Sequence, residues 1–312
     1  MKKLKIGNII KTAWSIYRSR FKEYYRLALT NSFWIFVPVY GWAKYAAMMG
    51  LLARLAHGDV AGNSETTVEA KRYIKPKTWL FFGAGLISSL VFYIELFAVG
   101  ILLLIVSAIL TIANPYIAFS NLFGLAISIL SIYSFYWIMS HLFLYELPLA
   151  VGENTNVRQS RDISWKLATE SVFSLQIIIF VFFLVYGLFY FLLQVLTGII
   201  DNEVTLQSSG SIINSHSFSC LLTLLKEAFF FFGSIFVPAF SSAFHILGSY
   251  LFSSVFNWIS YSILELISIV MFAILNIAVG ALFIPFWQSL KAVAYYQLNL
   301  PSENTNRELN YS

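Results

Sequence analysis

The chain has 312 residues and a net charge of +5; 59% of its residues are apolar and only 11% are charged. Soluble domains usually carry about a quarter charged side chains, so this composition excludes an ordinary soluble protein. It indicates an all-α, polytopic membrane bundle that forms one domain over residues 1–300.

Sequence motifs give no sign of a metal, a cofactor or a catalytic centre. A single cysteine, Cys220, excludes an intramolecular disulfide. Four histidines lie far apart without metal-binding spacing: His57, His141, His216 and His245. Nucleophile-elbow, Walker and dinucleotide-binding motifs are also absent from the sequence, so no catalytic residue is assigned and no enzyme is expected.

The first predicted element, residues 1–26, is a basic amphipathic helix. Apolar residues recur every three or four positions, and the opposite side carries cations that we assign to anionic lipid: Lys11, Arg18, Lys22 and Arg26. We expect the helix to lie in the headgroup layer, where each cation contributes about 1 kcal/mol. The alternative is a solvated helix that packs on a partner.

Residues 27–56 are apolar but interrupted at Val37-Pro38-Val39-Tyr40-Gly41-Trp42. Proline removes a helical hydrogen bond and glycine loosens the backbone. This segment also carries Lys44 and Arg54. We therefore predict a broken or re-entrant segment here.

Four longer stretches, 79–113, 116–151, 173–200 and 259–290, are predicted transmembrane spans. The first two form a hairpin around Asn114-Pro115. In the first, Gly83 and Gly85 are expected at close helix contacts. The other segments are a cytoplasmic interfacial helix at 152–171, a broken apolar segment at 221–257 and a flexible tail at 301–312.

Lysine and arginine concentrate in three segments, which predicts the orientation. The N-terminus and the stretches 58–78 and 152–171 are basic, whereas the Asn114 turn and the 201–217 loop contain no cation. All three basic segments can share the cytoplasmic side only if residues 27–56 make no net crossing. The C-terminus is then cytoplasmic if 221–257 also fails to cross, and outside if it crosses.

Ionisable residues within apolar segments are candidates for function because their burial in hydrocarbon is costly. Glu95 is the clearest, and the others are Glu265, Lys44 and His245. Glu95 is either a proton- or substrate-coupled carboxylate or a structural hydrogen-bonding group between helices. Its partner is expected among Lys44, Arg54, Lys226 and His245. Snorkelling and capping explain His141 and Glu146, which lie close to a predicted helix end.

Aromatic residues near the predicted span boundaries fit anchoring at the membrane interface. They include Trp79, Tyr145, Trp287, Tyr295 and Tyr296.

Three stretches form a pattern when taken in order. They are Gly7-Asn8-Ile9-Ile10 leading to Trp14 and Tyr17; Glu146-Leu147-Pro148 followed by Gln159-Ser160-Arg161-Asp162-Ile163-Ser164-Trp165-Lys166-Leu167; and Lys291-Ala292-Val293-Ala294-Tyr295-Tyr296-Gln297-Leu298. The pattern resembles the glycerophosphoryl diester phosphodiesterase membrane-domain family and related stand-alone bacterial membrane proteins. The resemblance implies a cytoplasmic helix around Trp165, a cytoplasmic C-terminus, and a module of the bacterial cell membrane that recruits or senses lipid. The diesterase activity belongs to a separate soluble barrel, for which this chain lacks both the length and the residues.

These observations favour a non-catalytic membrane protein that scaffolds a partner or senses lipid. The alternative is a secondary transporter or permease for a small molecule or lipid, because discontinuous helices and a buried acid are features of carriers. An intramembrane enzyme ranks third. The expected partners are membrane lipids with anionic headgroups, with a protein partner or a second copy left open and no nucleic acid.

Overall fold

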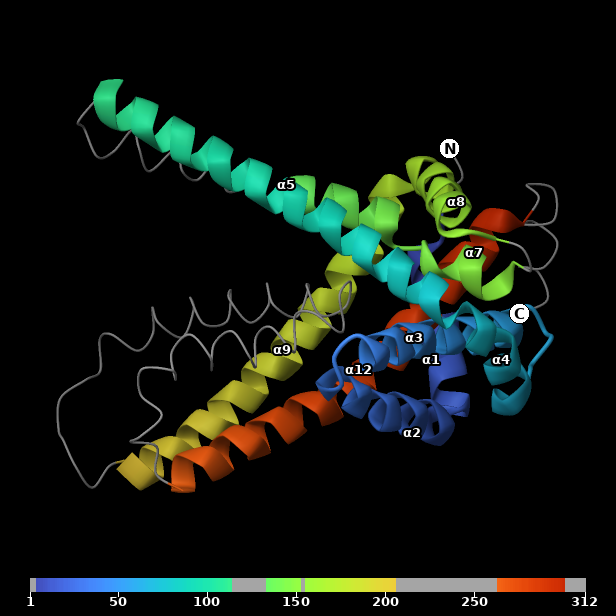
Figure 1. Ribbon diagram of the computed structural model, residues 1–312, viewed down its shortest axis with the longest axis horizontal. Coiled ribbons are helices and arrows are strands. Elements are labelled where there is room, and N and C mark those ends of the chain that lie inside the picture. The colour runs from blue at the N-terminus through green and yellow to red at the C-terminus, as the bar shows by residue number, and fades with distance from the viewer. Residues whose placement is uncertain (1–3, 114–132, 153–154, 206–262, 301–312) are drawn as a thin grey trace.

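The computed structural model describes residues 4–113, 133–152, 155–205 and 263–300, which form helices and short connections (Figure 1). No strand occurs among these residues, so the all-helical class is confirmed for the described part of the chain. Three predicted features fall outside it: the turn at Asn114-Pro115, the segment 221–257 and the tail 301–312.

The basic N-terminal sequence forms two helices, α1 (Ile6–Ser19) and α2 (Phe21–Ser32), and not the single helix that we predicted. The break lies at Arg20, whose φ of −116° and ψ of 24° are not helical. Apolar spacing could not reveal it because the spacing stays regular on both sides. One side of α1 is buried within the protein: Ile9, Ala13 and Tyr17. This apolar side therefore packs on other helices and does not enter the headgroup layer.

A short 3₁₀ helix, η1 (Phe33–Phe36), leads from α2 to α3 (Tyr40–Val60), and α2 and α3 form a hairpin (Figure 1). The predicted interruption at Val37-Pro38 lies in the connection. Continuous burial from Met48 to Ala53 marks α3 as a central helix of the protein, since a helix that is buried all round is enclosed by its neighbours.

Local capping signals explain where the next helices begin. α4 (Thr67–Ile74) starts with a capping box in which the Thr66 hydroxyl accepts from the Glu69 amide and the Glu69 carboxylate accepts from the Thr66 amide. Through η2 (Lys75–Lys77) the chain then enters α5 (Thr78–Ala113), the first long apolar helix.

The described half of the predicted span 116–151 is not one helix. Residues 133–142 are helical, residues 143–145 form a turn, and α7 (Glu146–Val151) follows. Pro148 accounts for the break, because in a continuous helix its ring would clash with the carbonyl of Leu144.

Three further helices complete the described chain: α8 (Val157–Thr169), α9 (Val172–Thr205) and α12 (Ile263–Asn299). α8 begins with a second capping box, formed by Asn156 and Gln159.

Most of the shorter helices pack with parts of the long ones into one unit, which we call the head. Its buried apolar side chains come from residues 4–84, 139–150, 168–183 and 281–298, and Val157 and Leu167 of α8 pack against them. Within it, α3 packs against α12, α5 and α7. Gly50 lies where α3 meets α5, since a Cβ there would fall within 3.0 Å of the Phe81 ring. Our expectation for Gly83 and Gly85 does not hold among the described residues, none of which lies within 4 Å of a Cβ at either position.

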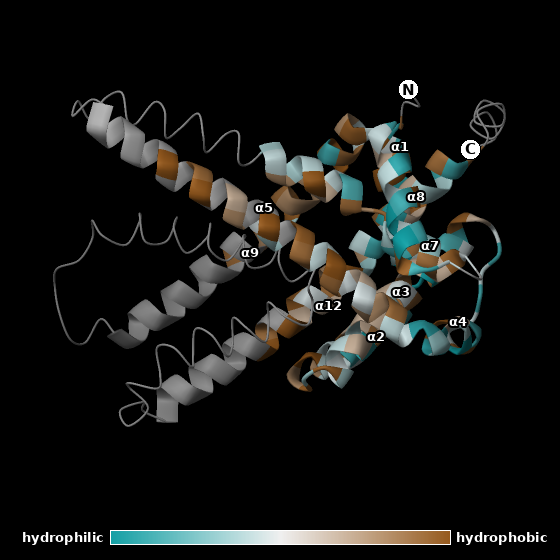
Figure 2. Ribbon diagram, turned by 45° about the horizontal axis from the view of Figure 1, so that its top comes forward, coloured by the Kyte–Doolittle hydropathy of each residue, from teal (hydrophilic) through white to brown (hydrophobic). Residues whose placement is uncertain are grey.

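The remaining parts of α5, α9 and α12 project from one side of the head, to the left in Figure 1. Large apolar side chains are exposed along them, including Leu90 (62%), Phe97 (71%), Leu188 (58%) and Ile274 (56%). Figure 2 shows hydrophobic residues along α5, whereas hydrophilic residues gather on the head. Among the described residues two helical stretches are long and apolar enough to cross a membrane, Val172–Phe189 and Ile277–Asn299. The second is 67% buried, because its C-terminal part lies inside the head.

Candidate functional site

An ion pair is buried in the head where α7 meets α12. Lys291 Nζ donates a hydrogen bond to Glu146 Oε2 over 3.0 Å, and Gln288 Nε2 donates to the same oxygen over 2.9 Å. The side chains of Lys291 and Glu146 are only 1% and 5% exposed. An unpaired charge at such a depth is very costly, so each of the two ions requires the other.

Sequence reasoning missed this pair and assigned Glu146 to the end of a membrane span. A partial signal was present, because Glu146 is the lone Asp, Glu, Lys or Arg of residues 116–151 and Lys291 is the lone one of residues 266–302. A lone charge in a buried run requires an opposite charge from elsewhere in the chain, but the run itself does not specify which one. The interfacial role predicted for Tyr145 and Trp287 was also wrong, because both side chains are buried in the head, at 5% and 0% exposure.

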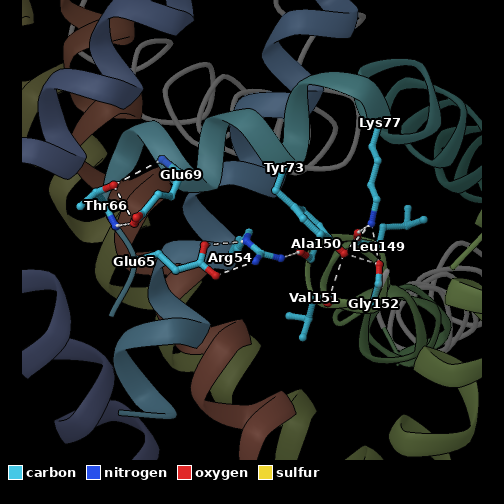
Figure 3. Close-up of polar contacts among 10 residues, drawn as sticks. All are labelled: Arg54, Glu65, Thr66, Glu69, Tyr73, Lys77, Leu149, Ala150, Val151 and Gly152. Carbon is cyan, nitrogen blue, oxygen red and sulfur yellow. Dashed lines mark hydrogen bonds and ion pairs between the residues drawn. The ribbon is translucent and has the colours of Figure 1, made fainter. Parts of the chain in front are cut away.

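Arg54 connects α3 to the loop before α4 and to the end of α7 (Figure 3). Its Nε and Nη2 atoms donate to the two carboxylate oxygens of Glu65 over 2.7 and 2.5 Å, and its Nη1 donates to the Ala150 carbonyl over 2.9 Å. Such a bidentate pair fixes the orientation of both side chains.

Lys77 binds the same end of α7 from another side (Figure 3). Its ammonium donates to the carbonyls of Leu149 and Gly152 over 3.2 and 2.5 Å, and the Tyr73 hydroxyl donates to Gly152 over 2.7 Å. The last carbonyls of a helix lack helical partners and carry partial negative charge. Both cations therefore stabilise the C-terminus of α7, which Arg54 fixes to α3 and Lys77 fixes to η2, directly before α5.

A third polar cluster joins α2 to the end of α3. Arg20 Nη1 lies 3.0 Å from Asp59 Oδ1, and Arg20 Nε lies 2.9 Å from Glu23 Oε2. The hydrogen bond from Arg20 lowers the pKa of Glu23. Burial, reinforced by the Asp59 carboxylate that accepts a hydrogen bond from its hydroxyl, raises the pKa of Tyr24. The break between α1 and α2 thus places Arg20 where two acids can bind it.

Of the four predicted intramembrane ionisable residues, the structure describes the surroundings of Lys44 alone. Its Nζ lies 3.6 Å from the centre of the Trp34 ring and 4.7 Å from that of Tyr40. Glu95 lies in α5 and Glu265 in α12, but their side chains, like all of His245, are outside the described part of the chain. Arg54, another expected partner of Glu95, binds Glu65.

The four predicted lipid-contacting cations are all exposed on α1 and α2: Lys11, Arg18, Lys22 and Arg26. Two aromatic residues on the same helices are also exposed, Trp14 at 52% and Phe21 at 38%. This surface combines cations with interfacial aromatic rings, which is the chemistry that anionic membranes attract.

The pair of Glu146 with Lys291 joins the second and third of the stretches on which the family resemblance depends. Tyr17 of the first stretch also binds α12, because its hydroxyl donates to the Leu282 carbonyl over 2.8 Å. Within the head, the Ser164 hydroxyl of α8 donates to the His141 carbonyl over 2.8 Å.

Comparison with protein-family models, curated proteins and solved structures finds no match. Among the described residues, no group of three or more His, Cys, Asp and Glu side chains is placed to hold a metal ion.

Proposed function

We propose that this chain is a non-catalytic, multi-pass membrane protein whose head lies on the cytoplasmic face, associates with anionic lipid, and acts as a scaffold or lipid sensor. The observation that carries the proposal is the separation between the packed head and the apolar helices that project from one side of it (Figures 1 and 2). Exposed apolar surface of this extent needs a nonaqueous environment.

The direction of the chain supports four crossings. It leaves the head along α5, returns through residues 133–142, leaves again along α9 and returns along α12. Both α1 and the end of α12 belong to the head, because Ile9 and Leu298 are buried in the same core. The two ends of the chain are therefore proposed to share one side.

Charge supports the cytoplasmic side for the head. Lys71, Arg72 and Lys75 are exposed on α4 and η2, in addition to the cations of α1 and α2. Lysine and arginine near membrane spans favour the cytoplasmic face. The same face carries the anionic lipids that basic surfaces bind.

Lipid association can be tested with the full chain in bilayers that contain spin-labelled lipids. The variant Lys11→Gln, Lys22→Gln, Arg26→Gln removes two lysines and one arginine from α1 and α2. Its matched control, Lys71→Gln, Arg72→Gln, Lys75→Gln, removes the same charges from α4 and η2. Since each cation close to the surface contributes about 1 kcal/mol, we expect the first variant to lose at least fivefold of the preference for phosphatidylglycerol over phosphatidylcholine. The control should keep most of that preference.

An equal loss in both variants, or no loss in the first, would contradict a lipid site on α1 and α2. A reconstituted protein that moves a solute, in a manner abolished by Glu95→Gln, would replace the scaffold or sensor role with transport.

A further inference from the structure

The connection between α2 and α3 exposes large apolar side chains on the head. Five of its residues are between 41% and 53% exposed: Phe33, Phe36, Val37, Val39 and Tyr40. We call residues 33–40 the apolar turn. Contiguous exposed apolar residues, in contrast to single ones, mark a surface that another apolar phase covers.

The backbone of the apolar turn is held in one shape. Trp42 Nε1 donates to the Ile35 carbonyl over 2.9 Å. Gly41 approaches the Trp34 carbonyl so closely that a Cβ would clash with it. Val39 has a φ of 59°, in the left-handed region that β-branched residues avoid. Strain of this kind persists where the surrounding structure enforces it and clusters at functional positions, so the exposed side chains are presented by a fixed backbone.

A cation lies at the base of the apolar turn. The Lys44 ammonium is held over the rings of Trp34 and Tyr40, at 3.6 and 4.7 Å from their centres. None of the ion pairs in the described part of the chain involves Lys44. Contact with aromatic faces leaves ammonium N–H donors for an anion. Lys22 and Arg26 are exposed one helical turn apart on the adjoining α2.

The turn faces the side of the head from which the long apolar helices project. Figures 1 and 2 both show the α2–α3 connection on that side, whereas α4 lies at the opposite end of the head. The apolar turn thus combines aromatic rings and aliphatic side chains with the adjacent ammonium of Lys44. This combination is typical of the boundary between acyl chains and headgroups.

We propose that the apolar turn inserts into the bilayer and that Lys44 binds the phosphate of an anionic phospholipid there. This inference depends on the proposed membrane function and names the element that contacts the lipid. The phosphate replaces the carboxylate partner that Lys44 lacks in the described chain, while Phe33, Phe36 and Val37 occupy the acyl region.

Insertion is tested by the depth of a spin label in the full chain, reconstituted in bilayers, with Cys220→Ala as background. The label is placed at Phe36→Cys and, as a matched control, at Val68→Cys, an apolar residue of α4 that is 72% exposed. We expect the label at 36 to collide more often with oxygen than with a water-soluble nickel chelate, and the label at 68 to show the reverse. A second label at Val37→Cys repeats the test if Phe36→Cys does not fold. Equal access of the nickel chelate at 36 and 68 would overturn insertion.

Phosphate binding is tested by quenching of a fluorophore at position 36 with phosphatidylglycerol or phosphatidylcholine that carries a headgroup spin label. Phosphatidylglycerol should quench at least twofold more than phosphatidylcholine at equal content. Lys44→Gln should abolish the difference and Lys44→Arg should retain it. Equal quenching in the unsubstituted protein, or a difference that survives Lys44→Gln, would overturn the role of Lys44.

The two proposals can fail separately. A water-exposed label at 36, together with a lipid preference that depends on Lys11, Lys22 and Arg26, would overturn the insertion of the apolar turn but keep the proposed function. A membrane-embedded label without any preference for anionic lipid removes lipid association but keeps insertion.

Discussion

Removing the Lys291 ammonium is expected to be among the most damaging single changes in the head. In Lys291→Met a side chain of similar length replaces the lysine, and the Glu146 carboxylate loses its cationic partner while it keeps the neutral donor Gln288. The carboxylate is 5% exposed, so water cannot replace the lost partner. Breaking a buried pair in this way costs about 3–5 kcal/mol.

The double variant Glu146→Gln, Lys291→Met separates the charge from the volume. It leaves no buried ion, and replacing a whole buried pair with neutral groups is often close to neutral in stability. We therefore expect the double variant to be more stable than Lys291→Met alone. The non-additivity measures the coupling between the two side chains.

Thermal unfolding in one fixed detergent provides the assay. For domains of 150–250 residues each kcal/mol shifts Tm by about 2–4 °C, so Lys291→Met should lower Tm by about 6–20 °C. Lys75→Met serves as the control because Lys75 is exposed on η2, and it should stay within about 0.5 kcal/mol of the parent. A Tm for Lys291→Met within 1 °C of the parent, or a double variant as unstable as the sum of both single changes, would refute a coupled buried pair.

Three further predictions use the same assay. Gly50→Ala should destabilise the chain by about 1–3 kcal/mol, because the new Cβ would clash with the ring of Phe81, which is buried and must move. The control Gly83→Ala should be neutral or stabilising. Equal effects of the two changes would contradict the close contact of α3 with α5. Arg54→Met should lower the free energy of unfolding by about 1.5–3 kcal/mol, because it removes charge-assisted hydrogen bonds. The control Arg72→Met, at an exposed position, should lower it by less than about 0.5 kcal/mol. Similar losses in both variants would show that the pair of Arg54 with Glu65 contributes little. Burial, followed by the Arg54 charge, lowers the pKa of His57. The imidazole of the folded chain therefore binds a proton more weakly than that of the unfolded chain. Because of this difference, the stability that is present above about pH 6.5 is lost as the pH falls through the folded pKa. His57→Gln should therefore lose less stability than the parent between pH 7.5 and 5; an unchanged pH dependence would exclude His57 as its source.

Composition predicted the helical class because long apolar segments indicate membrane helices. This indication depends on many residues together, so a single polar or helix-breaking residue does not change it. Local backbone rules were also informative. The interruption expected at Val37-Pro38 lies between η1 and α3, since proline acts through its own ring and the preceding turn.

Tertiary contacts could not be predicted from one sequence. The apolar side of α1 packs on the protein, although a membrane-surface helix would show the same periodicity. Trp287 and Tyr145 look like interfacial anchors by position, yet they are buried, because the head extends farther along α12 than hydropathy indicates. The partner of Glu146 lies 145 residues away in the chain, and no local pattern specifies which buried cation reaches a given carboxylate.

Cysteine accessibility across sealed membranes tests the central claim most directly. Single cysteines at Ser64, Ser209 and Ser302 in a Cys220→Ala background would be labelled with an impermeant maleimide from either side. Four crossings with the head inside predict that Ser64 and Ser302 react from the cytoplasmic side and Ser209 reacts only from the outside. Reaction of Ser64 and Ser209 from the same side would contradict the proposed architecture.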